Sequence, residues 1–68
     1  MPYPSNEALP LAVRQRLPPG AQDIFRETFN HAWEEYGHDE GAAFRVAWAA
    51  VKRRYEKRGG DWVPRAEA

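Results

Sequence analysis

The titratable side chains of this 68-residue chain are densest in one short stretch. His31 and His38 lie in a run of acids, with Glu35 between them. On a continuous helix these three residues occupy positions i, i+4 and i+7 and share a face, and imidazole and carboxylate groups are ligands of divalent metals. Gly37, however, interrupts the helical pattern just before His38, and no fourth ligand is evident. We therefore expect a solvated acidic surface without a metal or cofactor, and keep a weak metal site as the alternative.

The sequence offers no pattern for nucleophilic catalysis. It contains no cysteine, and its only aliphatic hydroxyls, Ser5 and Thr28, are not accompanied by the histidine and carboxylate that activate a nucleophile. We therefore expect no catalytic residues and a protein that is not an enzyme.

A basic run near the C-terminal end is the second chemical feature. Such a run can contact phosphates, complement the acidic surface of a partner protein or of another copy, or match the negative end of a helix dipole with solvated side chains. All three readings stay open. We expect the partner-binding residues to be the five cations of this run and a tryptophan beyond it: Lys52, Arg53, Arg54, Lys57, Arg58 and Trp62.

The zero net charge conceals two segments of opposite sign. Asp23 to Glu40 holds six acids and one base, and Arg45 to Arg58 holds six bases and one acid. The expected acidic face comprises Glu27, Glu34 and Glu35. A nucleic-acid-binding domain normally has a net positive excess, so this segregation favours a protein partner. Nucleic-acid binding through the basic end is the alternative, led by phosphates because alanine and tryptophan cannot read base edges as amides and guanidinium groups do.

The spacing of apolar residues predicts three helices, over about 9–17, 20–36 and 40–57. Prolines follow the first helix, Gly37 supplies a left-handed stop after the second, and Asp39 is placed to cap the third. Gly59-Gly60 then ends the third helix. The short link from Gly37 to Gly41 makes the second and third helices antiparallel neighbours. Trp33 and Trp48 lie in the apolar stripes and are expected in the core, in a seam with neighbouring alanines.

The ends of the chain predict irregular structure. Prolines extend both termini, which could pair briefly as strands or pack over the helices, and we expect a flexible tail at 63–68. The fold class is therefore mainly α, a small three-helix domain at 1–68 with a minor β pairing. The sequence has no secretory signal and no apolar run near the roughly 20 residues that span a bilayer. We expect a cytoplasmic protein that is not embedded in a membrane.

The order and spacing of the motifs resemble the ChaB family of small bacterial proteins, which are named as regulators of cation transport. The matching elements include Leu9-Pro10, Ala21-Gln22-Asp23-Ile24-Phe25, Ala32-Trp33, Val46-Ala47-Trp48-Ala49-Ala50-Val51-Lys52, Tyr55 and Trp62. The resemblance implies a compact, mainly helical fold and a role beside a sodium/calcium–proton antiporter. It also implies that the protein partner is a cation antiporter or its regulator. The family offers no agreed catalytic residues to transfer.

Overall fold

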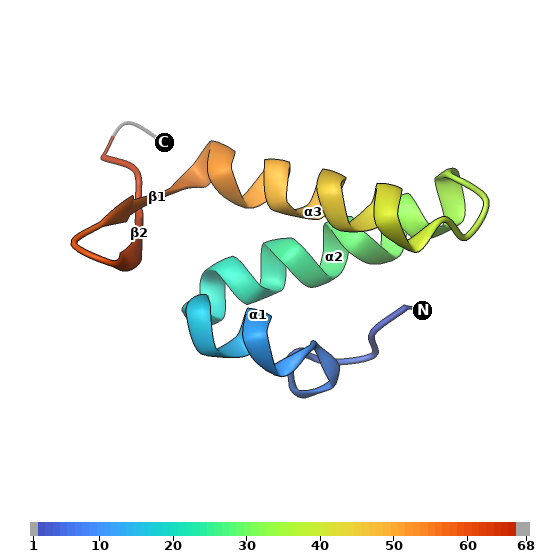
Figure 1. Ribbon diagram of the computed structural model, residues 1–68, viewed down its shortest axis with the longest axis horizontal. Coiled ribbons are helices and arrows are strands. Elements are labelled where there is room, and N and C mark those ends of the chain that lie inside the picture. The colour runs from blue at the N-terminus through green and yellow to red at the C-terminus, as the bar shows by residue number, and fades with distance from the viewer. Residues whose placement is uncertain (1, 67–68) are drawn as a thin grey trace.

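The computed structural model describes residues 2–66 and is mainly helical with one short antiparallel sheet, as predicted. Figure 1 shows α2 and α3 side by side as the longest elements, with the small sheet projecting beyond the end of α3. The elements in chain order are the 3₁₀ helix η1 (Asn6–Ala8), α1 (Leu11–Arg16), α2 (Pro19–Glu35), α3 (Glu40–Arg54), β1 (Tyr55–Arg58) and β2 (Asp61–Pro64).

The seam between α2 and α3 is lined by alanines, which confirms the prediction. Ala32 of α2 and Ala43 and Ala47 of α3 are buried. A methyl side chain lets two helix backbones approach closely, so the flanking aromatic rings can close over the contact. The ring of Trp48 meets that of Phe25 edge-to-face at 5.4 Å, and the ring of Trp33 stacks on that of Phe29 at 6.1 Å. Both tryptophans are only half-buried, because they lie along the edge of the seam.

The N-terminal part of the chain covers the other side of α2. Leu9, Val13 and Leu17 are all buried and belong to the hydrophobic core. The helix itself is shorter than the predicted 9–17. Pro10 has extended backbone angles, and Leu17 is extended because it precedes a proline. Tyr3 also docks on α2, where the Asn30 side chain donates to its carbonyl and accepts from its N–H, both at 2.8 Å.

The link between α2 and α3 has the predicted stop and start. Gly37 adopts the left-handed conformation with φ of 65°, and the backbone N–H of His38 donates to the Trp33 carbonyl at 2.8 Å. Asp39 then caps α3, because its carboxylate accepts from the backbone N–H of Ala42 at 3.1 Å. These contacts fix the antiparallel arrangement of the two helices.

The prediction that the third helix reaches residue 57 is wrong. α3 ends at Arg54, and the next four residues form β1, which pairs antiparallel with β2. Gly59 and Gly60 both have positive φ, 55° and 88°, which is the requirement of a two-residue hairpin turn. The glycines therefore turn a hairpin and do not end a helix. The predicted flexible tail at 63–68 is wrong where it overlaps β2, at 63 and 64, and residues 67 and 68 lie outside the described part.

Candidate functional site

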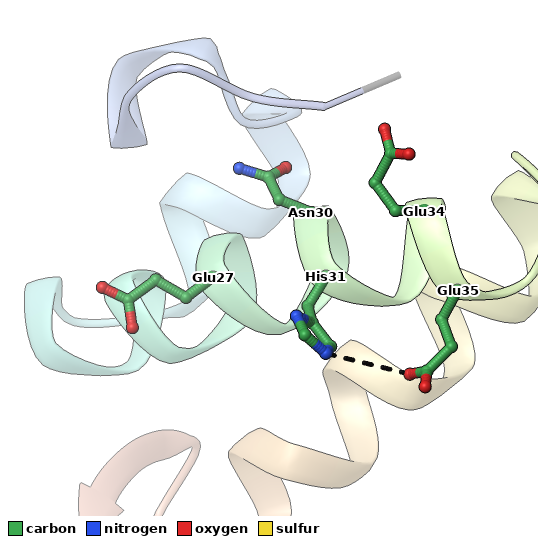
Figure 2. Close-up of a pocket in the computed structure, with 5 residues that line it drawn as sticks. All are labelled: Glu27, Asn30, His31, Glu34 and Glu35. Carbon is green, nitrogen blue, oxygen red and sulfur yellow. Dashed lines mark ion pairs between the residues drawn. The ribbon is translucent and has the colours of Figure 1, made fainter.

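The expected acidic face lies on the exposed surface of α2 and divides into two sides. Glu27, Glu34 and Glu35 line one open hollow together with Asn30 and His31. Figure 2 shows that Asn30 and Glu34 point to the side of the N-terminal segment, whereas His31 and Glu35 point to the side of α3. The three carboxylates therefore share one helix surface but do not converge on one point.

The two histidines pair with different carboxylates. His31 Nε2 lies 3.9 Å from Glu35 Oε1, and His38 Nε2 lies 3.7 Å from Glu34 Oε2. Because Gly37 ends α2, His38 does not continue the helical face of His31 and Glu35. Among residues 2–66 there is no group of three or more side chains that could hold a metal ion. The arrangement proposed from sequence for His31, Glu35 and His38 is thus not formed.

A groove runs between α2 and α3 on the side of Glu35. Part of it is lined by Thr28, Ala32, Tyr36 and Val46, with Glu27, His31 and Glu35 at its border. Tyr36 is 51% exposed although it is a large aromatic residue. The chain leaves the helical conformation at Tyr36, and its side chain therefore lies at the rim of the groove.

The basic run is divided between two elements. Lys52, Arg53 and Arg54 form the last turn of α3, whereas Lys57 and Arg58 lie on β1. All five side chains are exposed. Within residues 2–66, the three cations of α3 take part in no ion pair, while Arg58 Nε lies 3.0 Å from Glu56 Oε2. No ion pair in this range joins the basic run to the acidic face of α2.

Trp62 docks on the helical core instead of projecting freely. Its ring centroid lies 5.9 Å from that of Trp48, and the side chain is half-buried. Lys57, its cross-strand partner, places Nζ 5.9 Å from the Trp62 ring centroid, a cation–π distance. The strand pairing thus places an ammonium group over this indole ring. Trp62 therefore supports the basic run by packing between Trp48 and Lys57.

Sequence reasoning missed the residue that joins the hairpin to α3. Arg65 Nε donates to the carbonyl of Lys52 at 2.8 Å, and the Arg65 backbone N–H donates to the carbonyl of Arg54 at 2.9 Å. Both carbonyls belong to the end of α3, where helix oxygens lack intrahelical partners. The signal that could have revealed the hairpin is the Gly59-Gly60 pair between two short segments with β-forming residues.

Comparison with known proteins places the chain in a defined group. The sequence model of the ChaB family matches residues 9–65. A protein of Escherichia coli K12 named "Putative cation transport regulator ChaB" is 43% identical over 70 aligned positions, which cover 90% of this chain and 92% of the relative. A protein of Lymantria dispar multicapsid nuclear polyhedrosis virus, named only by its place in the LEF8-FP intergenic region, is 36% identical over 85% of this chain and 78% of the relative.

The fold agrees with a solved structure of the same group. The solution NMR structure of a protein with the ChaB name superposes with a TM-score of 0.83 at 40% identity, covering 96% of this chain and all of the other. Within residues 2–66, the helices are too short and too polar to cross a bilayer.

Proposed function

The chain belongs to the ChaB family, and we propose from this membership that it is a non-enzymatic, cytoplasmic protein-interaction module that regulates cation transport. The relatives' name supports the regulatory role. The partner in this proposal is a cation antiporter or a protein that regulates one. In this proposal, six residues of this chain bind the partner, and we call them the basic end: Lys52, Arg53, Arg54, Lys57, Arg58 and Trp62.

One observation carries this proposal. Lys52, Arg53 and Arg54 form no ion pair within residues 2–66, although the same chain holds as many acids as bases. These cations stand on the last turn of α3, and the adjacent hairpin is held to that turn by Arg65. A preorganised set of exposed charges steers a partner of opposite sign and gives specificity to the encounter. Glu27, Glu34 and Glu35 offer a second surface of opposite sign on the same partner-binding module.

A salt-dependent capture experiment tests this role. The tagged protein is incubated with the cytoplasmic and membrane fractions of its native cell, and captured proteins are identified at rising salt. We expect capture of a cation transporter or its regulator that weakens with salt, since screening removes exposed ionic contacts. The variant Lys52→Glu/Lys57→Glu should lose this capture, while Arg16→Glu/Arg45→Glu, with the same change in net charge on other surfaces, should retain it. Capture that ignores both salt and charge reversal contradicts the proposal.

The exposed cations also favour a second candidate, a nucleic-acid-binding accessory protein. Lys57 is held over Trp62, and its neighbours in α3 are free to contact phosphates. Binding of this kind weakens steeply with salt because neutralised phosphates release counterions. A labelled duplex and a labelled single strand, titrated at low salt, test it. Failure of both to bind rules out this candidate and leaves the protein-partner role in place.

A further inference from the structure

One face of the α2–α3 pair carries positive charge at one end and negative charge at the other. A hollow lined by Ile24, Ala50, Arg53 and Arg54 shares Glu27 and Thr28 with the groove that contains Glu35 and Tyr36. Because the two depressions share residues of α2, they follow each other along the same side of the helix pair. The positive and negative charges are therefore separated along one continuous surface of the α2–α3 pair.

The two charged ends of this surface are well separated. Ile24 lies beside the arginines, and Glu35 lies eleven residues further along α2. At the rise of an α-helix this is about 16 Å, roughly twice the distance over which physiological salt screens a charge. Arg53 and Arg54 are thus too far from Glu35 to pair with it in the same molecule. Between the two ends lie the acid Glu27 and the small or apolar side chains of Thr28, Val46 and Ala50.

We propose that this α2–α3 face binds a second copy of the chain across a two-fold axis. A two-fold axis that lies in the plane of the contact, perpendicular to the line joining the two charged ends, brings Arg53 and Arg54 of one copy onto Glu35 of the other. The same contact forms again at the opposite end. The partly exposed Tyr36 ring and Val46 are covered at the same time. This inference goes beyond the proposed function, with which it shares Arg53, Arg54 and Glu35.

Charge complementarity selects a second copy as the occupant. A partner segment of one sign matches only one end of the face and is repelled by the other. A copy of the same face, turned by the two-fold axis, meets both ends with charge of the opposite sign. The zero net charge of the chain removes the overall repulsion that would otherwise oppose association of identical molecules.

Sedimentation equilibrium of the full chain is the first test. At low salt the average mass should rise with concentration from 7.8 kDa toward twice that value. It should fall again when salt screens the exposed contacts. A mass that stays at the monomer value up to roughly 1 mM protein, where even weak association is measurable, overturns the proposal.

A complementary pair of variants tests which face is used. Arg53→Glu/Arg54→Glu and Glu27→Lys/Glu35→Lys should each dimerise at least about tenfold more weakly than the native chain, because each places like charges together at both contacts. An equimolar mixture of the two should recover a heterodimer, since both contacts then regain opposite signs. The control, Arg16→Glu/Arg45→Glu, should dimerise as the native chain does.

The remaining outcomes also decide the question. If the native dimer persists in either double variant alone, or the mixture does not associate, the contact lies elsewhere and the proposal is wrong.

Circular dichroism confirms that each variant is folded, as expected because all four residues lie outside the buried core. NMR spectra recorded on dilution add a measurement without mutation, in which the amide signals of Tyr36, Val46 and Ala50 should shift. The variant Lys52→Glu/Lys57→Glu separates this dimer from the proposed function: it should lose capture of the transport protein and still dimerise, because neither lysine lines the two depressions of this face.

Discussion

The imidazole of His38 stacks on the indole of Trp33, with ring centroids 5.0 Å apart and planes inclined by 13°. The same two residues are joined by the hydrogen bond from the His38 backbone N–H to the Trp33 carbonyl. An apolar contact of this kind commonly accompanies the left-handed stop of a helix. It also explains why His38 does not face a metal with His31 and Glu35: its ring is engaged by the helix stop and by Glu34.

The stop conformation should contribute measurably to stability. Gly37→Ala should lower the free energy of unfolding by about 1 kcal/mol, because a Cβ disfavours the left-handed conformation. Chemical denaturation measures the loss. Gly41→Ala is the matched control. A Cβ there meets Asp39 and Arg45 only at ordinary contact distance, 3.6 Å, and alanine is the better helix former, so stability should be unchanged or higher. Equal losses in both variants would contradict the importance of the left-handed stop.

The alanine seam should not accept a larger side chain. Ala47→Leu should lower the free energy of unfolding by about 1–3 kcal/mol, because Ala47 is fully buried between α2 and α3 and the helices must separate to admit the new atoms. Thermal or urea unfolding checks this. Ala49→Leu, two residues away on the exposed side of the same helix, should leave stability nearly unchanged. A harmless Ala47→Leu would show that the seam is looser than the structure indicates.

The attachment of the hairpin should depend on Arg65. Arg65→Ala removes the bond from the guanidinium to the Lys52 carbonyl, and a typical hydrogen bond contributes about 1 kcal/mol to stability. Amide hydrogen exchange in β1 and β2 should therefore become faster, while exchange in the centre of α2 should change less. Arg16→Ala serves as the control, since Arg16 is exposed on α1. Unchanged exchange in the hairpin would mean that Trp62 packing and the backbone bond from residue 65 to the Arg54 carbonyl are enough to hold it in place.

The docking of Tyr3 should make stability fall at alkaline pH. Burial, and secondarily the charge of Glu40, raise the pKa of Tyr3 above its ordinary value of 10.0. Above about pH 10 the unfolded chain releases this proton while the folded chain still holds it, so the folded state binds more protons and loses stability as pH rises. The contribution is fully present below pH 10.

A comparison of variants isolates this effect from the other titrating groups. The difference in unfolding free energy between the native chain and Tyr3→Phe should be constant below about pH 10 and should decrease above it. Glu40→Gln should reduce the decrease, because it removes the second cause of the raised pKa. A difference that grows with pH would reverse the sign and contradict the docked position of Tyr3.

Local sequence rules predicted the number of helices and the link between the second and the third. The spacing of apolar residues predicted the three helices, and Gly37 and Asp39 identified the stop of one helix and the start of the next. Each of these features depends on residues within about two helical turns, so the sequence shows them directly. The ChaB resemblance also followed from such motifs, because their order along the chain is enough to recognise them.

The C-terminal region required the tertiary structure. The basic residues from Lys52 to Arg58 satisfy a helix pattern as well as a hairpin pattern, and local propensity alone does not separate the two. Packing decides between them. Trp62 reaches Trp48 across the end of α3, and Arg65 bonds the last helical carbonyls, and both contacts form only if the chain reverses at Gly59-Gly60.

The positions of the charged side chains in space also depended on the tertiary structure. The sequence by itself determined that the acids and bases of this chain are segregated, since that is a property of their order. Only the packing of α2 against α3 placed Glu35 and Arg53 at opposite ends of one face and left both exposed. The reason is geometric: antiparallel helices bring residues that are far apart in sequence onto one surface, and their distances follow from the helix rise and crossing.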